Sequence, residues 1–403
     1  MFHFSRARIN VKSTGAGLGL RGPKRGDSFG SACAQAHRER EGRESSDSPR
    51  SPWNTLLFAA TFTARLRKVA MPRVNRAFLD NALYEIVPRT RDSLPMPPTQ
   101  TSNELKLGIL GRTQRDSKVE LSHFVDMNNH SHTLAVSNDC RRLSDFYMEV
   151  QKKTTDAVKA LLGLSSLSLW EGRPMVAEIP TLDDAINRIV YIYCNPSSAS
   201  LCNSIEEYPG INSWSAFLQC EPRVDAEVEI DARWYPVSEI PKLPSRSLSP
   251  KQDTSILQKL LGSEKAFSHP IFIKPFKWLE VFGIVEPKQI ERIRRKIIDR
   301  VREKERANAE ARRAAGKRSV PRSVLVREPY MKSHKPEKKE RKIYLICGDK
   351  ELRLELLERF QQIFDRCREC YRKAKEGLRV DWPPGTFTPW FPPGFTFPVS
   401  VAA

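Results

Sequence analysis

Hydrophobic residues between positions 82 and 195 recur with two different periods. Alternating or short apolar runs bounded by turn residues predict strands over residues 82–87, 118–127, 130–136 and 174–179. Spacings of three and four residues predict helices over residues 140–162 and 182–195. Asn128-Asn129 is a turn signal between two strands, Thr181 is a helix N-cap candidate, and Pro196 is expected to end that helix. The pattern predicts an α+β fold, with helices packed on one antiparallel sheet.

The rest of the chain divides by composition. We expect residues 1–70 to be a disordered basic leader or tail, because they carry 13 Lys and Arg against 5 Asp and Glu. Residues 71–222 hold the predicted sheet and should fold alone. The remainder is expected to be a mostly helical, basic extension. It comprises a linker with short apolar segments at 223–287, a basic helix and linker at 288–342, and a small strand-helix region with a Pro- and aromatic-rich tail at 343–403.

The charge balance narrows the classes of function. The 403 residues carry a formal net charge of +19, which favours polyanionic partners such as nucleic acid. No apolar run approaches the ~18 residues of a membrane-spanning helix, so we expect no membrane partner. Eight cysteines in a chain of this length are too few for a disulfide scaffold. These features predict a soluble protein of a reducing compartment.

Two pairs of residues are candidates for a site. His130 and His132 are two apart on a predicted strand, so their imidazoles would point to one face of the sheet and could share a divalent cation. Tyr191 and Asn195 are four apart on a predicted helix and share one of its faces. Each pair taken alone also fits a structural role, in which the histidines pack and Tyr191 is a half-buried core aromatic. His123, on the preceding strand, is expected to be a packing or polar surface residue.

Taken together, these residue types suggest chemistry at phosphorus. A metal ion held by two neutral histidines and an amide oxygen, with open positions, can polarise a scissile phosphate. A tyrosine beside it can attack phosphorus and hold the product covalently. Tyr193 lies about 200° around the helix from Tyr191, so only one of the two is expected to face the sheet. Asn195 shares the face of Tyr191, which makes Tyr191 the expected nucleophile.

Four segments, in one order, resemble motifs of a known family. Residues 127–136 read MNNHSHTLAV, similar to MPNHFHLLV, and residues 169–173 read LWEGR, similar to LWQGR. Residues 188–196 read RIVYIYCNP, similar to RYIxxNP, and residues 207–215 read EYPGINSWS, similar to DYPWSSY. These are motifs of the single-tyrosine HUH transposases, in particular of the REP-associated tyrosine transposases of bacteria. The resemblance spans residues 80–220.

The resemblance implies a ferredoxin-like HUH palm and a DNA-cleaving active site. It implies Mg²⁺ or Mn²⁺ at His130, His132 and Asn195. Tyr191 would cleave and rejoin single-stranded or hairpin DNA through a 5′-phosphotyrosine. One nucleophile per chain would leave a second cleavage to a second copy, so a homodimer is a further expectation. The resemblance also implies that the protein is bacterial and cytoplasmic.

The resemblance also points to residues that contact DNA and to an alternative function. Arg89 and Arg91 follow the first predicted strand, Arg173 closes the LWEGR segment, and all three are candidates for DNA contact. Ser131 stands where the family motif has a hydrophobic residue. The alternative is therefore a decayed or domesticated protein that keeps the fold and binds nucleic acid without cleaving it.

Overall fold

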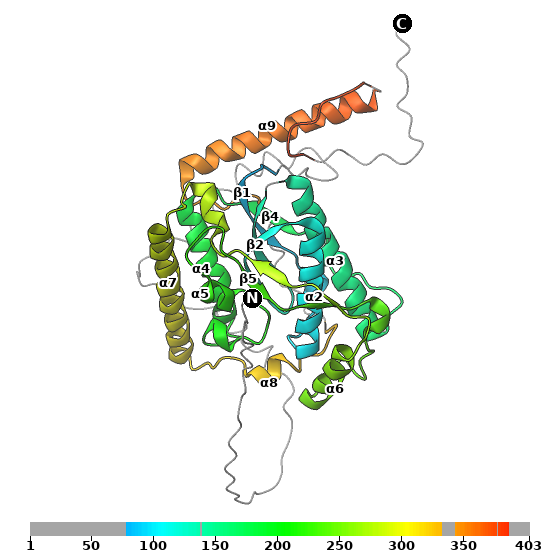
Figure 1. Cartoon of the computed structure of the whole chain (residues 1–403). Helices are drawn as coiled ribbons and strands as arrows, with labels where there is room; N and C mark the ends of the chain where they lie inside the picture. Colours follow the sequence, from blue (N-terminus) through cyan, green and yellow to red (C-terminus); the bar gives the residue numbers. More distant parts are fainter. Residues whose placement is uncertain (1–77, 138, 333–342, 377, 387–403) are drawn as a thin grey trace, which may run out of the picture. The chain divides into compact units, whose positions relative to one another are not determined.

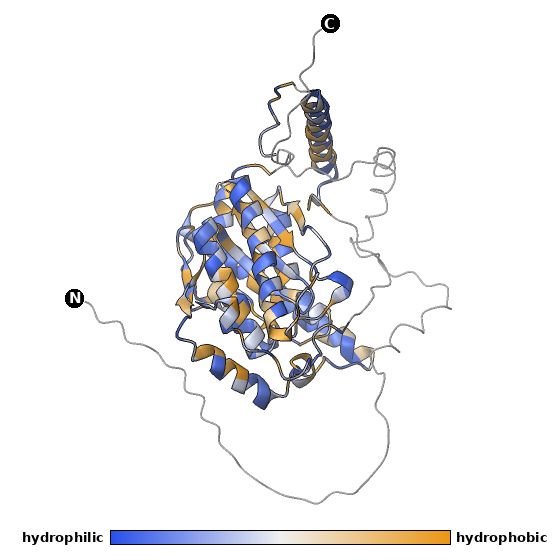
Figure 2. Cartoon of the chain, turned by 90° about the vertical axis from the view of Figure 1, so that its right-hand side faces the viewer, coloured by the Kyte–Doolittle hydropathy of each residue, from blue (hydrophilic) through white to orange (hydrophobic). Residues whose placement is uncertain are grey.

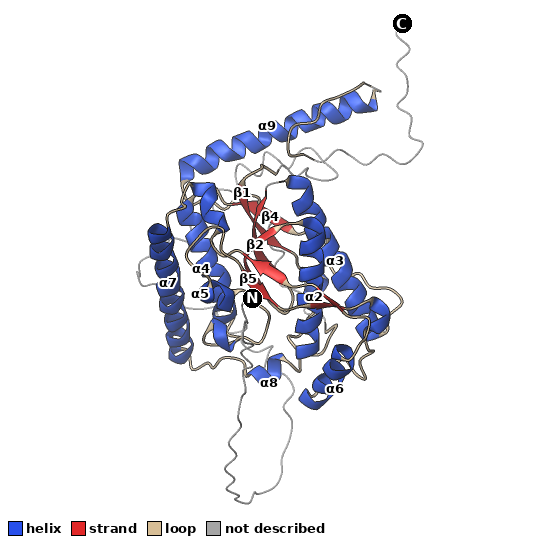
Figure 3. Cartoon of the chain, in the orientation of Figure 1, coloured by secondary structure: helices blue, strands red, loops and turns tan. Residues whose placement is uncertain are grey.

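A six-stranded sheet lies at the centre of the structure, a computed structural model that describes residues 78–137, 139–332, 343–376 and 378–386. All these residues belong to one compact unit, residues 73–403, and the leader predicted at 1–70 lies outside them. Helices pack on the sheet (Figure 1), and Figure 3 separates the two kinds of element by colour. No helix in the described ranges has both the length and the apolar character needed to cross a bilayer.

The sheet has the strand order β4-β1-β3-β2-β8-β5. Its strands are β1 (Ala82–Val87), β2 (Glu120–Asp126), β3 (Ser131–Ser137), β4 (Met175–Glu178), β5 (Val228–Ile230) and β8 (Ile271–Ile273). A separate ribbon pairs β6 (Arg233–Trp234) with β7 (Phe267–Ser268). The helices are α2 (Gln100–Ser117), α3 (Cys140–Leu162), α4 (Leu182–Ser198), α5 (Trp214–Gln219), α6 (Pro250–Leu261), α7 (Pro287–Ala314), α8 (Arg322–Leu325) and α9 (Lys350–Lys375).

The first four strands have ferredoxin-like connectivity. The chain runs β1-α2-β2-β3-α3-β4, and β1 lies between β3 and β4, antiparallel to both. β2 is antiparallel to β3, which places β3 between β1 and β2. This order is that of a split βαβ fold. The α+β prediction is therefore confirmed.

Side chains alternate between two cores because successive residues of a strand point to opposite faces. On β1, Leu83 joins the core beneath α4 and α7, whereas Tyr84 joins the core beneath α2 and α3. On β3, Leu134 and Ala135 divide in the same way. Apolar residues of the helices pack into these cores, and Figure 2 shows hydrophobic and hydrophilic residues side by side on the helices that face the viewer. Any residue two positions from Leu134 therefore lies on the α4 side of the sheet.

Helix α4 begins as predicted but ends later. The Thr181 side chain accepts a hydrogen bond from the backbone N–H of Asp184, which caps the helix. Pro196 lies inside the helix, which continues to Ser198, so the expectation that Pro196 ends it is wrong. A proline in the last turn removes only one backbone donor there, and the turn survives that loss. Asn195 consequently keeps a helical position.

Two other expectations differ from the structure. Residues 223–287 are not only a linker, because they contribute β5 and β8 to the central sheet. Ile273 of β8 pairs with Leu121 of β2, and β5 pairs with β8. These strands have three residues each, too few for a visible alternation. The strand expected at the start of the strand-helix region, residues 343–403, is instead an isolated parallel bridge from Leu345 to Glu178 at the end of β4.

Candidate catalytic site

The two histidines meet on the α4 side of the sheet. His132 is two residues from Leu134 on β3 and only 1% exposed, while His130 precedes β3 and is half-buried. Their ring centroids are 5.0 Å apart, with the planes at 84°. His130 and His132 therefore lie side by side on one face of the sheet, as predicted, at the start of β3.

Hydrogen bonds orient both imidazole rings. Nδ1 of His132 lies 2.8 Å from a carboxylate oxygen of Glu85, and Nδ1 of His130 lies 2.7 Å from the side-chain oxygen of Asn129. An oxygen acceptor at Nδ1 places the proton there and leaves the lone pair on Nε2. Burial lowers the pKa of His130 well below 6.5, and the charges of His132 and Arg89 lower it further. A neutral imidazole with its lone pair on Nε2 is the form that binds a divalent metal ion, and the lowered pKa of His130 favours that form at His130.

A buried carboxylate, which the sequence analysis missed, lies behind His132. Glu85 of β1 is fully buried, accepts from His132 and forms an ion pair of 2.7 Å with Arg188 of α4. Burial alone would raise the pKa of Glu85, but the hydrogen bond from His132 and the charge of Arg188 lower it. Glu85 therefore stays ionised and fixes the ring of His132. A lone acid in the apolar segment ALYEIV was the sequence signal that could have revealed it.

Helix α4 contributes three polar side chains to the region around His132. Arg188, Tyr191 and Asn195 are spaced by three and four residues, so they share one face of the helix. The Tyr191 ring lies 5.6 Å from the His132 ring, and the Arg188 guanidinium carbon lies 4.1 Å from the centre of the Tyr191 ring. The Asn195 side-chain nitrogen is 2.7 Å from Nε2 of His132. Tyr191 is 40% exposed, so a large substrate could reach it.

The second tyrosine of α4 has a different environment. Tyr193 is fully buried, and its hydroxyl lies 2.7 Å from Nδ1 of His123 on β2 and 3.0 Å from the Ser213 hydroxyl. Burial raises its pKa above 10, although Ser213 opposes the rise. The expectation that only one tyrosine faces the sheet is wrong, since α4 lies so that Tyr191 contacts β3 and Tyr193 contacts β2. Tyr191 remains the tyrosine beside the histidine pair.

The three candidate arginines lie around the loops next to His130. Arg89 forms a backbone bridge with His130, and the backbone N–H of Arg91 donates to Leu169. Arg91 and Arg173 are exposed, and Arg89 is half-buried. The backbone N–H of Glu171 donates to the carbonyl of Arg89, which joins the two loops. These contacts bring the segments that carry all three arginines to the edge of the candidate site.

Three side chains around His132 carry atoms of the kind that ligate divalent cations. His130 and His132 each offer Nε2, and a half-turn of the Asn195 amide would present its oxygen where its nitrogen now lies. Nitrogen and oxygen of an amide exchange places with no other movement. Within the described residues no group of three His, Cys, Asp or Glu could hold a metal ion, so Asn195 would have to complete the set.

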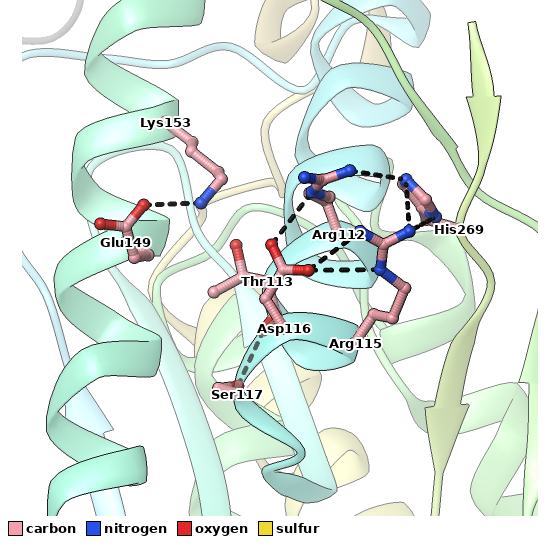
Figure 4. Close-up of polar contacts among 8 residues, drawn as sticks. All are labelled: Arg112, Thr113, Arg115, Asp116, Ser117, Glu149, Lys153 and His269. Atoms are coloured by element: carbon pink, nitrogen blue, oxygen red, sulfur yellow. Dashed lines mark hydrogen bonds and ion pairs between the residues drawn. The ribbon is translucent and has the colours of Figure 1, made fainter.

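A second polar cluster lies on the α2 side of the sheet (Figure 4). Arg112 and Arg115 of α2 both approach His269, with 3.2 Å from Arg112 to Nε2, and both pair with Asp116 at 3.0 Å. His269 and Arg115 also line an open cavity of about 550 Å³. Burial lowers the pKa of His269, and the two arginines add to this. A neutral His269 can accept a hydrogen bond from Arg112, so the cluster joins α2 to the segment before β8.

Comparisons with known proteins do not assign a family. No family model matches the chain, and neither does any curated protein. The chain is similar to a solved REP-associated tyrosine transposase bound to a REP hairpin, with 18% identity, a TM-score of 0.32, and 37% of this chain and 86% of that one covered. It is also similar to tRNA(His) guanylyltransferase from Saccharomyces cerevisiae, with 12% identity, a TM-score of 0.26, and coverages of 56% and 88%. At these TM-scores neither likeness indicates a function for this chain.

Proposed function

We propose that this chain is a metal-dependent endonuclease and strand transferase for single-stranded or hairpin DNA, with Tyr191 as its nucleophile. The observation that supports this is the arrangement around His132. An exposed tyrosine lies against its ring, an arginine lies over that tyrosine, and the Asn195 amide reaches its Nε2. A candidate nucleophile, a cationic group and the side chains that could ligate a metal ion therefore lie together at the start of β3.

His130, His132 and Asn195 would hold Mg²⁺ or Mn²⁺. When bound, the cation would polarise the scissile phosphate. Glu85 holds the His132 ring through Nδ1, and partners of this kind orient the ligand and raise its basicity. Arg188, paired with Glu85, also lies over the Tyr191 ring and helps to hold it in place. Its charge also lies where a phosphate approaching Tyr191 would meet it.

The cleavage step is a transfer of the phosphodiester to Tyr191. The Tyr191 oxygen attacks phosphorus and loses its proton to solvent, while the bond from phosphorus to the 3′ oxygen breaks and that oxygen takes a proton from solvent. The products are a free 3′-hydroxyl strand and a strand joined to the protein through its 5′-phosphate. Attack by a 3′-hydroxyl on this phosphotyrosine reverses the exchange and joins DNA. With one such nucleophile per chain, a homodimer would supply two cleavages.

The test follows the label of a cleaved oligonucleotide. Random-sequence single strands and hairpins, labelled at the 3′ end, are incubated with the full chain and Mg²⁺ or Mn²⁺. The labelled strand should migrate with the protein on a denaturing gel, whereas a 5′ label should appear on a free, shorter strand. Binding without any adduct under either metal would refute the enzyme and support the alternative, a protein that binds nucleic acid without cleaving it.

A further inference from the structure

Two arginines of α2 converge on one histidine. His269, which precedes β8, is only 6% exposed. Nη1 of Arg112 lies 3.2 Å from Nε2 of this ring, and Nη1 of Arg115 lies 3.4 Å from both ring nitrogens. Figure 4 shows both guanidinium groups turned toward the imidazole. The three side chains therefore form one cluster, on the side of the sheet away from His132.

This cluster holds more hydrogen-bond donors than acceptors. Each guanidinium has five N–H donors, whereas a neutral imidazole has one lone pair and one N–H. When the lone pair of His269 accepts from Arg112, the N–H of Arg115 that faces the ring has no full acceptor there. Among the described residues, Asp116 supplies the one carboxylate within ion-pair distance of either arginine, at 3.0 Å from each. An acceptor from outside the protein would complete the set.

Positive charge also exceeds negative charge at the cluster. Two guanidinium groups share the single carboxylate of Asp116. Burial lowers the pKa of His269, and the two arginines lower it further against the opposing charge of Asp116. On the neighbouring helix α3, Lys152 and Lys153 likewise share one carboxylate, that of Glu149. The surroundings of the His269 ring are therefore electropositive.

The adjoining cavity does not cancel this charge. Its lining includes the cations Arg115, Lys118 and Lys274 and the anions Glu120 and Glu227. Glu120 is already engaged, because its carboxylate lies 2.9 Å from the Lys274 ammonium. Cations thus outnumber anions along the cavity as well as at the histidine.

An exposed aromatic ring lies beside the histidine. Phe267 of β7 is 54% exposed, and its ring is within 13° of parallel to that of His269, with the centroids 6.3 Å apart. Backbone contacts fix this segment on α2. A Cβ at Gly111 would lie 1.9 Å from the carbonyl oxygen of His269, so the glycine permits the close approach. The His269 N–H donates to Ala232 at 2.9 Å.

We propose that Arg112, Arg115 and Phe267 form a second binding site, which takes single-stranded nucleic acid. A backbone phosphate accepts hydrogen bonds from the two arginines, and the base of an adjoining nucleotide stacks on Phe267. Phosphate oxygens supply the acceptors and the negative charge that the cluster lacks. Cations combined with exposed aromatic rings bind single strands without reading their sequence. The site lies across the sheet from His132 and does not depend on cleavage by Tyr191.

The test uses the full chain and a fluorescent oligothymidylate, without divalent cation, so that binding is measured in the absence of cleavage. Arg115→Gln removes a guanidinium whose side chain is 52% exposed and leaves Arg112 paired with Asp116. The matched control is Arg295→Gln, which removes the guanidinium of another exposed ion pair, 2.8 Å from Glu291. Thermal unfolding establishes that each variant is folded.

Binding is measured at several salt concentrations. Each phosphate contact contributes about 0.7 to the slope of log K against log salt for a single strand. We expect Arg115→Gln to reduce the magnitude of this slope by about 0.7 and Arg295→Gln to leave it unchanged. Phe267→Ala should weaken binding at least about fivefold, because a stacked base is lost, whereas Phe267→Trp keeps an aromatic face and should bind within about twofold of the wild type.

Three outcomes would overturn the site. The first is an equal slope in Arg115→Gln and Arg295→Gln, or no binding by the wild type. The second is unchanged binding by Phe267→Ala. The third is displacement of the strand by an equal concentration of free thymidine 5′-monophosphate, which would show a nucleotide site in place of a strand site. None of these measurements involves the adduct at Tyr191, so the endonuclease can fail while this site stands, and the reverse.

Discussion

The two tyrosines of α4 provide a test in which chemistry and stability should separate. Replacing Tyr193 by Phe removes a buried hydroxyl that lies 2.7 Å from Nδ1 of His123 and 3.0 Å from Ser213. Ser213 keeps its other partner, because its oxygen also lies 2.8 Å from the backbone nitrogen of Phe124. The imidazole of His123 keeps no partner at Nδ1. Tyr193→Phe thus leaves one buried polar atom unsatisfied.

The size of each effect follows from these contacts. One buried atom without a partner costs about 1–3 kcal/mol. In a domain of this size that lowers Tm by between about 2 and 12 °C. Tyr191→Phe removes a hydroxyl from a half-exposed ring, so the free energy of unfolding should change by less than about 0.5 kcal/mol. The phenylalanine ring at position 191 keeps the contacts with His132 and Arg188 but has no oxygen to attack phosphorus.

Thermal unfolding and trapping of the 3′-labelled adduct are measured on the same preparations. Tyr191→Phe should unfold at the wild-type temperature and form no adduct. Tyr193→Phe should unfold at a lower temperature than the wild type. It should still form the adduct at a temperature where the variant is folded. An adduct from the Tyr191 variant, with none from a folded Tyr193 variant, would show that the wrong tyrosine has been assigned. Equal losses of stability would show that the burial argument is wrong.

Three further predictions concern the metal site, the buried histidine and the contact between α6 and α2. The double variant His130→Ala/His132→Ala should lose divalent-dependent cleavage but retain single-strand binding in a filter assay, and unchanged cleavage would exclude the metal site. Burial lowers the pKa of His123 to about 3, against ~6.5 for an unfolded histidine. The unfolded chain therefore binds a proton in that window that the folded chain does not, and stability should fall as pH decreases from about 6.5 to 3, by up to ~1.4 kcal/mol per pH unit. Denaturant titrations at several pH values should show a smaller dependence for His123→Gln, and an identical dependence would contradict the assignment. Asp253 accepts the first two backbone N–H groups of α2, so Asp253→Ala should cost about 1–3 kcal/mol in a denaturant melt. Asp253→Asn, which keeps one acceptor, should cost less, and equal costs would argue against a role in capping.

Local periodicity explains what could be predicted from the sequence. The strand at 82–87 and the helix at 140–162 have the predicted bounds, because alternation and three-four spacing are properties of the residues themselves. The pairing of His130 with His132, and of Tyr191 with Asn195, depends on the same short-range geometry. These features needed no knowledge of the tertiary contacts.

The features that could not be predicted depend on contacts between segments far apart in the chain. Helix α2 was not predicted, since Gly108 and Gly111 interrupt its apolar pattern. In the structure a Cβ at either glycine would collide with the backbone of Arg233 or His269, so the glycines let these segments pack on the helix. Glu85 was missed for a similar reason, because its partners come from β3 and α4. No local pattern connects these residues.

The segment beyond α8 has a consequence for association between copies. The backbone N–H of Glu178 donates to Tyr344, and its carbonyl accepts from Ile346, so the outer side of β4 is already paired at this residue. An exposed edge strand offers a row of unpaired groups on which another chain can add a strand. Here the row is broken, and a second copy cannot extend the sheet past Glu178. A homodimer would have to join through a different surface, and a chain shortened before Tyr344 would regain an open edge prone to aggregation.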